Sequence, residues 1–240
     1  MINFKEKPIL GMIHLSNDDA WGVTDRALNE IKVYQEEGLA GVIIENYHSG
    51  LSEVKDVLCE VAELKTTGHI SPDLNIGINI LPNDYQEAFK LADLHGFDFI
   101  QMDYVSGKYQ RSQEINESEY LDYRTKYPNI QVLGGVWPKY YTPVGGSSLE
   151  NDLKIAIKRC DAIVVTGSGT GKATPMDKIK MFRDIIGDFP LIIGAGVTPD
   201  NVKSQFEYGD GAIVGSTFKN HSITTNMVNR KLVKEFMKQV

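Results

Sequence analysis

The chain has 240 residues, of which 42% are hydrophobic and 24% are charged, and its formal net charge is -7 at pH 7. This composition is typical of a soluble globular protein, and the acidic balance argues against nucleic acid or an anionic membrane surface as the main partner. The sequence contains no long apolar run and no signal-peptide pattern, so we expect a cytoplasmic protein without membrane insertion.

Short apolar runs bounded by turn residues predict eight β-strands. In chain order they are PILGMIHL (8–15), GVIIEN (41–46), NIGINIL (75–81), FIQMDYV (99–105), IQVLGGV (130–136), AIVVTG (162–167), PLIIGAG (190–196) and GAIVGST (211–217). These runs are rich in Ile and Val and apolar on both faces, as buried parallel strands are. Helical patterns lie between them, for example at 24–38, which ends at Gly38, and at 83–96, which has an Asn/Asp start and a glycine stop.

Strands that begin roughly 20 to 35 residues apart and alternate with helices are the βα units of a parallel sheet. Eight such units in 240 residues predict one domain, 1–240, with the (β/α)8 TIM-barrel fold rather than an open doubly wound sheet. Active sites of these barrels lie at the C-terminal ends of the strands, and the loops after strands 7 and 8 often hold a phosphate. Polar residues at the strand ends are therefore the candidates for function.

Ionisable side chains lie at or near the ends of the first, second and fourth predicted strands. His14 closes strand 1 and alternates with Leu10 and Met12, so we expect all three to face one side; Glu45 closes strand 2 with Asn46, and Asp103 lies in strand 4. Two carboxylates at one mouth could share proton transfer, one of them raised in pKa by the other. Together with His14 they could instead bind a divalent cation. Each carboxylate could also be a helix cap or a partner of a loop amide.

Other polar residues would complete a catalytic set. Asn79 in the third strand and Lys139 after the fifth could orient or polarise a substrate. Lys139 could also form a Schiff base, act as a point charge for a phosphate, or be a solvated loop lysine. Gln101 and Asp103 are two residues apart, so we expect them on one face of strand 4, toward the barrel interior.

The ends of strands 7 and 8 predict a phosphate site. Glycines let backbone N–H groups approach an anion closely, and the N-terminus of a short helix adds its dipole. After strand 7 we expect such a helix, with Thr198 as N-cap and Pro199 as its first residue. The residues expected to bind are Gly194, Gly196, Gly215, Ser216 and Lys219.

The stretch VVTGSGTGKATP (164–175) resembles a nucleotide-binding loop but lacks the required residues. A Walker A motif needs glycine where Thr166 stands and Ser or Thr where Ala173 stands, and the alternating glycines also fail the dinucleotide fingerprint. In a barrel this stretch is the loop after strand 6. Thr166 and Gly167 would then line the pocket, and Lys172 would meet a ligand anion from a closing lid. A flexible connection without function is the alternative.

The cysteines and the remaining spacings give no cofactor motif. Cys59 and Cys160 lie in segments with helical patterns, and we expect both to be buried structural thiols rather than zinc ligands or a disulfide. No cofactor is predicted, although a divalent metal is compatible with the strand-end residues.

Six segments in order resemble the BtpA/SgcQ family, which belongs with the ribulose-phosphate-binding type of TIM barrel: PILGMIHL, GVIIEN, GINILPND, DAIVVTGSGTG, GAGVTPDN and GAIVGSTFK. The resemblance covers nearly the whole chain. It implies functional positions at His14, Glu45, Asn46, Asn79, Asn83, Asp84, Thr166, Gly167, Gly194, Gly196, Asn201, Gly215 and Lys219. The chain departs from the family pattern at Gly135, Lys139, Tyr140 and Asp103, which implies a shifted substrate or altered proton transfer.

Two hypotheses follow. In the first, the protein is an enzyme that acts on a small phosphorylated metabolite, a sugar phosphate or a nucleoside or sugar derivative, as an isomerase, a lyase or an enzyme that cleaves a glycosidic bond. In the second, it is a non-catalytic assembly or regulatory factor that retains a metabolite pocket. Ionisable groups that converge on one mouth favour the first, and a homo-oligomer is compatible with either.

Overall fold

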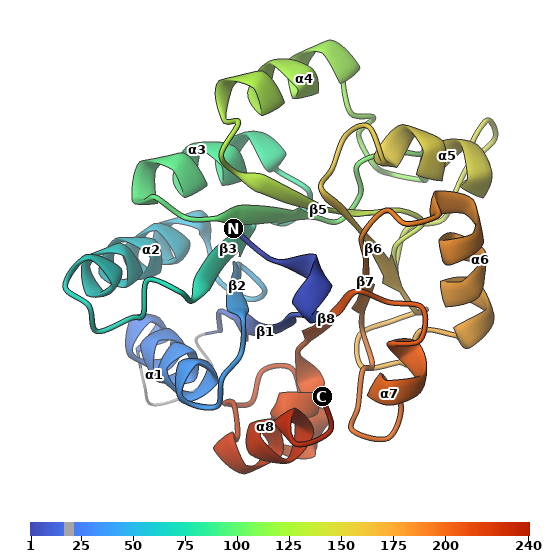
Figure 1. The fold of residues 1–240 in the computed structure, drawn as a ribbon. Helices are drawn as coiled ribbons and strands as arrows, with labels where there is room; N and C mark the ends of the chain where they lie inside the picture. Colours follow the sequence, from blue (N-terminus) through green and yellow to red (C-terminus); the bar gives the residue numbers. More distant parts are fainter. Residues whose placement is uncertain (17–21) are drawn as a thin grey trace.

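The computed structural model describes residues 1–16 and 22–240, and within them eight parallel strands close into a barrel in the order β1 to β8 (Figure 1). The strands are β1 (Ile9–His14), β2 (Gly41–Glu45), β3 (Asn75–Asn79), β4 (Phe99–Met102), β5 (Gln131–Gly135), β6 (Ala162–Thr166), β7 (Leu191–Gly194) and β8 (Gly211–Val214). The predicted (β/α)8 TIM-barrel fold is therefore confirmed.

Helices surround the ring of strands (Figure 1). They are α1 (Val23–Glu36), α2 (Leu51–Thr66), α3 (Tyr85–His95), α4 (Glu117–Lys126), α5 (Leu149–Ala156), α6 (Met176–Ile186), α7 (Val202–Gln205) and α8 (Arg230–Met237), with short 3-10 turns η1 (Phe4–Glu6), η2 (Ser216–Phe218) and η3 (Asn220–Ser222). Within residues 1–16 and 22–240, no helix has the length and apolar character needed to cross a membrane.

Alternate strand residues fill the inside of the barrel. Strand β1 pairs with β2 so that Met12 lies beside Ile43 and His14 beside Glu45. Paired residues of adjacent parallel strands point to the same side, so Leu10, Met12 and His14 all face inward, as the alternation predicts. The apolar interior consists of Ile2, Leu10, Met12, Ile43, Phe99, Leu133, Ala162, Val164, Ile192 and Ile213.

The outward side chains of the strands pack against the helices. On α1, Ala27, Ile31 and Tyr34 are buried. The Tyr34 ring lies directly against the strand because β1 has a glycine there: a Cβ atom on Gly11 would be 2.6 Å from the ring. The Tyr34 hydroxyl donates a hydrogen bond to the Met12 carbonyl at 3.1 Å, which satisfies its polar atom inside the core.

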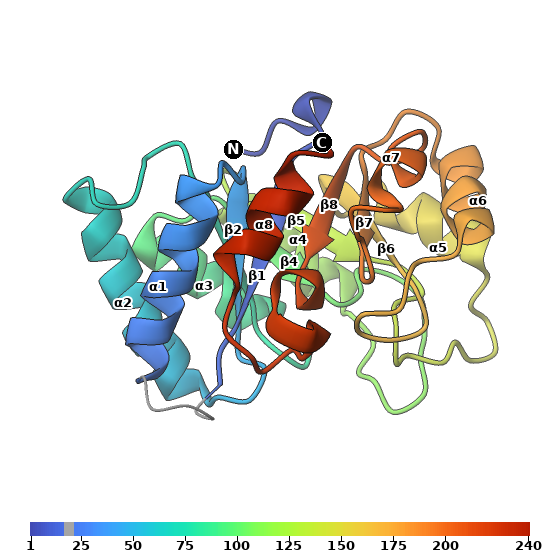
Figure 2. The same ribbon diagram turned by 90° about the horizontal axis from the view of Figure 1, so that it is seen from below.

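The N-terminal segment closes one end of the barrel. Ile2 belongs to the interior cluster, with Phe4 packed against it, and the Ile2 N–H donates to Gln131 Oε1 at 2.6 Å. Both termini lie at this end, and long loops gather at the other (Figure 2). A ligand would therefore approach the interior from the C-terminal ends of the strands.

Several strands are shorter than predicted because side chains replace the neighbouring strand as hydrogen-bond partner. The apolar run of β3 continues to Leu81, but the Asn46 side-chain amide accepts from the Leu81 N–H at 2.7 Å and donates to its carbonyl at 3.2 Å. Strand β4 ends at Met102, so Asp103 follows the strand instead of lying within it. The chain therefore leaves the sheet earlier than its apolar pattern suggests.

The helix after β7 also begins later than predicted. The Asn201 side chain accepts from the Thr198 N–H at 2.8 Å and donates to the Gly196 carbonyl at 2.9 Å, which holds this segment as a turn. Helix α7 consequently begins at Val202, and Thr198 is not its N-cap.

The two cysteines differ from expectation. Cys59 lies on α2 but is exposed, and Cys160 is buried but follows the end of α5. The prediction of a buried thiol is thus wrong for Cys59, and the prediction of a helical position is wrong for Cys160. A helical pattern alone does not say which face of α2 the Cys59 side chain occupies.

Candidate active site

A cavity of about 340 Å³ opens at the C-terminal ends of the strands, within the size range of small-molecule sites. It is lined by many of the residues predicted from the strand ends: His14, Glu45, Asp103, Lys139, Thr166, Gly194, Gly196, Gly215 and Ser216. The barrel thus brings together groups that are up to about two hundred residues apart in the chain.

The side chains at the ends of the first three strands form one row. The strand register places His14 beside Glu45 and Glu45 beside Asn79. Asn79 is only 1% exposed and belongs to this row, where its Nδ2 donates to Glu45 Oε2 at 2.7 Å. The same side chain also favours the charged form of Asp103, so it influences both carboxyl groups.

The two carboxyl groups have raised pKa values. Burial, and next the charge of Asp103, raise the pKa of Glu45 to about 7, although Lys139 and the Asn79 hydrogen bond oppose this shift. Burial also raises the pKa of Asp103, against the Tyr141 hydroxyl that donates to its Oδ2 at 2.8 Å. Glu45 can therefore exchange a proton near neutral pH.

His14 lies beside this pair as a neutral imidazole. Its Nε2 is 3.8 Å from Glu45 Oε1, and burial, followed by the charges of Lys219 and Lys139, lowers its pKa well below the ordinary value. Its Nδ1 has no hydrogen-bond partner among the described residues. A Cβ atom at Gly215 would be 2.8 Å from the His14 ring, so the glycine after β8 makes room for the imidazole.

The loops after β7 and β8 present backbone N–H groups at the other side of the cavity. In the part of the chain that the structure describes, the N–H groups of Gly196, Ser216 and Thr217 donate to no protein acceptor. Ala195 and Gly196 both have positive φ, which turns the chain sharply after β7. The Thr217 hydroxyl donates to the Val197 carbonyl at 2.6 Å and fixes one loop to the other. Such unpaired N–H groups can bind an anion.

The loop after β6 lines the cavity with Thr170 and Gly171 and contacts the loop after β5. The Thr170 N–H donates to the Tyr140 hydroxyl at 2.8 Å, and Lys139 Nζ donates to Thr170 Oγ1 at 3.2 Å. Thr170 lines the cavity, whereas Gly167 does not, and a Cβ there would clash with the Lys172 and Ala173 carbonyls. The Lys172 side chain is exposed and lies outside the lining.

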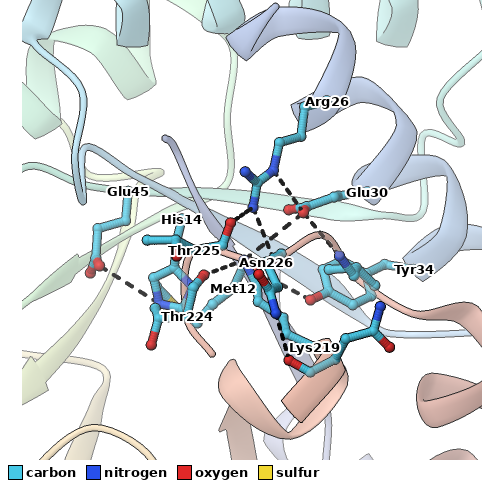
Figure 3. Close-up of polar contacts among 12 residues, drawn as sticks. Met12, His14, Arg26, Glu30, Tyr34, Glu45, Lys219, Thr224, Thr225 and Asn226 are labelled. Carbon is cyan, nitrogen blue, oxygen red and sulfur yellow. Dashed lines mark hydrogen bonds and ion pairs between the residues drawn. The ribbon is translucent and has the colours of Figure 1, made fainter. Parts of the chain in front are cut away.

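Lys219 lies behind the cavity instead of lining it. Its side chain is fully buried, with Nζ donating to the Thr224 carbonyl at 2.9 Å and 3.9 Å from Glu30 Oε1, beside Arg26 (Figure 3). Burial lowers the pKa of Lys219 to about 8. From this position the ammonium acts on the site through its charge, as its effect on the pKa of His14 shows.

Other polar residues implied by the family pattern hold loops in place. The Asn83 side chain bonds both the N–H and the carbonyl of Tyr104, at 3.0 and 3.1 Å, and Asp84 caps α3 by accepting from the Glu87 N–H at 3.1 Å. The residues whose side chains hydrogen-bond the backbone in this way are Asn46, Asn83, Asp84 and Asn201.

Several cavity residues were missed from the sequence: Tyr47, Leu81, Pro82, Pro138 and Tyr141. Each follows a strand by a few residues, so the rule that loops after the strands build the site could have found them. Tyrosine and proline in loops carry no motif of their own. Among residues 1–16 and 22–240, no three His, Cys, Asp or Glu side chains are grouped to hold a metal ion.

Solved structures with the same fold include the native KDPGal structure, with a TM-score of 0.66 and 15% identity over 97% of this chain and 93% of the other. Phosphoribosyl anthranilate isomerase from Thermus thermophilus has a TM-score of 0.62 and 9% identity over 97% of both chains. Thiamine phosphate pyrophosphorylase from Pyrococcus furiosus has a TM-score of 0.61 and 14% identity, covering 98% and 96%. At these identities the likeness shows the fold alone.

Sequence relatives are closer. An uncharacterized protein of Pyrococcus horikoshii is 31% identical over 256 residues, which cover 100% of this chain and 98% of the relative. The photosystem I biogenesis protein BtpA of Synechocystis is 25% identical over 96% of this chain and 86% of its own length. The BtpA family matches residues 5–240. The chain therefore belongs to the BtpA family.

Proposed function

We propose that this protein is an enzyme that acts on a small phosphorylated metabolite in the cavity at the strand ends. The observation that carries the proposal is Glu45, a carboxyl group with a pKa of about 7, placed beside Asp103 in a cavity that also offers backbone N–H groups. A group whose pKa lies near the working pH can both give and take a proton. Two fold neighbours are named for phosphorylated compounds, which agrees with the proposal.

In this proposal Glu45 transfers the proton and Asp103 is its charged neighbour, which stabilises positive charge that develops on the substrate. Asn79 holds the Glu45 carboxyl in position through the 2.7 Å hydrogen bond. Lys139 polarises a substrate oxygen, and neutral His14 donates or accepts a hydrogen bond. Isomerisation, aldol-type cleavage and glycosidic-bond cleavage all need proton transfer of this kind.

The phosphate would bind to the unpaired N–H groups of Gly196 and Ser216, with Gly194 and Gly215 allowing the close approach. Thr166 lines the same side of the cavity. Direct contact of Asn46, Gly167, Lys172 or Lys219 with the ligand stays a prediction, and for Lys172 it requires movement of the loop after β6.

Binding tests the phosphate site first. Inorganic phosphate and sugar phosphates should raise the melting temperature, because a ligand that binds only the native state stabilises it. Ser216→Asp places a negative charge among the N–H groups and should remove this response, whereas the same change at exposed Ser204 should keep it. A Ser216→Asp protein that folds and responds like the parent would contradict the site.

Turnover tests the catalytic assignment. Once a substrate is found by screening phosphorylated compounds, Glu45→Gln should lower kcat by about 100-fold or more, the usual size of an acid–base contribution. Glu45→Gln keeps the shape of the side chain, so ligand binding should persist. Undiminished turnover in this variant would remove Glu45 from the mechanism.

The Synechocystis relative favours a second candidate function. Its name as a biogenesis protein suggests a non-catalytic assembly factor that retains a metabolite pocket. In that case phosphorylated compounds would stabilise the protein without being converted, and Glu45→Gln would bind them as the parent does. Mass spectrometry of the recovered ligand after long incubation separates the two functions.

A further inference from the structure

The cavity is lined by backbone N–H groups on one side and by apolar and aromatic side chains on the other. Its N–H groups come from the loops after β7 and β8, and loops after β2, β3 and β5 contribute apolar and aromatic groups. Because the strands close in order from β1 to β8, β3 and β4 lie opposite β7 and β8. The aromatic and apolar residues of this wall are Tyr47, Leu81, Pro82, Pro138, Tyr140 and Tyr141.

The rings of Tyr47 and Tyr141 on this wall are held in place by their neighbours, whereas Tyr140 is 72% exposed. The Tyr141 hydroxyl donates to Asp103 at 2.8 Å, and its ring centroid lies 5.2 Å from that of Tyr104 and 5.7 Å from that of Tyr109. The Tyr47 ring lies 4.9 Å from the His14 ring in an edge contact. Both tyrosines keep part of their surface open to the cavity. Rigid rings of this kind bind a flat ligand with little loss of side-chain entropy.

The ionisable groups His14, Glu45, Asp103 and Lys139 line the same cavity, at the ends of β1 and β2 and in the segments after β4 and β5. A ligand whose phosphate is bound after β7 and β8 would extend across these groups toward the apolar wall. A ligand with a flat apolar ring would remove more of the surface of that wall from water than a plain sugar phosphate does, and the burial of apolar surface is favourable.

We infer that the ligand is a phosphorylated sugar that carries a flat aromatic or heteroaromatic group, which packs between Tyr47 and Tyr141. This inference rests on the proposed function, because the bound phosphate sets the orientation of the ligand. The bond that joins the sugar to the flat group then lies next to Glu45 and Asp103.

The test compares dissociation constants for ribose 5-phosphate and for a panel of ribose 5-phosphates with a phenyl, pyrimidine or purine group at C1. Isothermal titration calorimetry on the full chain provides the values. At least one member of the panel should bind about 5- to 150-fold more tightly than ribose 5-phosphate, the range expected from stacking of one ring on aromatic side chains.

Variants assign the effect to the rings. Tyr141→Leu should bring the ratio of the two dissociation constants close to one, whereas Tyr141→Phe keeps the ring and should keep the ratio. Tyr47→Leu gives a second test if Tyr141→Leu does not fold. A ratio of one or less for every panel member in the parent protein, with ribose 5-phosphate still bound, overturns the inference and leaves the proposed function standing. Loss of binding for all phosphorylated probes overturns both.

Discussion

Replacement of Glu30 tests whether the charged cluster behind the cavity holds the loop after β8. The Glu30 side chain is fully buried on α1, where its Oε1 accepts from Arg26 Nε at 3.2 Å and from the Val228 N–H at 3.0 Å. Lys219 Nζ lies 3.9 Å from the same atom (Figure 3). In Glu30→Ala the Lys219 ammonium retains, among the described residues, only the Thr224 carbonyl at 2.9 Å.

The expected loss of stability is large. Breaking a buried ion pair by removal of one partner costs about 3–5 kcal/mol, since the other charge stays buried. Burial already lowers the pKa of Lys219 to about 8, so loss of its proton limits the cost at neutral pH. We therefore expect the lower end of the range, about 3 kcal/mol, which corresponds to a fall in Tm of about 6–12 °C for a chain of this size.

The pH dependence has a definite sign. The pKa of Lys219 is about 8 in the folded protein and near its ordinary 10.5 in the unfolded chain, so the unfolded chain binds more protons between these values. Stability from this group therefore rises with pH above about 8. Because a neutral Lys219 needs no partner, Glu30→Ala should lose less stability at pH 9 than at pH 7, as measured by urea denaturation.

Two controls define the result. Glu30→Gln keeps the volume and an acceptor for the Val228 N–H, so it should lose less than Glu30→Ala. Glu150→Gln breaks an exposed pair with Lys154, 2.6 Å apart, and should leave stability unchanged. A Glu30→Ala protein with the Tm of the parent, or with an equal loss at both pH values, would refute the reasoning.

Three further predictions concern the barrel interior. Burial raises the pKa of Glu45 from 4.5 to about 7, so its contribution to stability is present below pH 4.5 and lost as the pH rises through 7. As the pH rises from 4.5 to 7, the free energy of unfolding of Glu45→Gln, measured by urea denaturation, should therefore increase relative to that of the parent. A difference in unfolding free energy that stays constant over this pH range would contradict this. Tyr141→Phe removes the 2.8 Å hydrogen bond that lowers the pKa of Asp103, so carboxyl NMR should show a higher pKa; an unchanged titration argues against that bond. Gly77→Ala puts a Cβ atom 2.2 Å from the Phe99 ring and should cost about 1–3 kcal/mol of unfolding free energy, whereas an unaltered urea midpoint would mean that the ring moves freely.

Part of the site could be predicted because the barrel has a strict rule for side-chain direction. His14 and Glu45 close their strands. The alternation of side chains and the register of β1 with β2 place them side by side, with His14 Nε2 3.8 Å from Glu45 Oε1. The prediction that Asp103 lies within strand 4 is wrong, since Asp103 follows the end of β4. It still lines the cavity, because the first residues after each strand share that end of the barrel.

The direction of Lys219 could not be predicted. Its position beyond β8 indicates a phosphate ligand, but the 3-10 turn η2 intervenes, and the side chain points to Glu30 on α1. Glu30 is 189 residues earlier in the chain, and a glutamate within a helix gives no sign that it is buried. The pairing exists only because α1 and the segment after β8 meet when the barrel closes.

The sequence by itself determined the eight strands, their inward and outward faces, and the glycines after β7 and β8, because these depend on local periodicity and on backbone freedom. The tertiary structure decided which carboxyl group takes up a proton near pH 7. That property depends on burial and on the charge of Asp103, both of which arise when the closed barrel brings the end of β2 and the residue after β4 to one cavity. The two-sided wall of the cavity has the same origin, since loops distant in the chain face each other only across a closed ring.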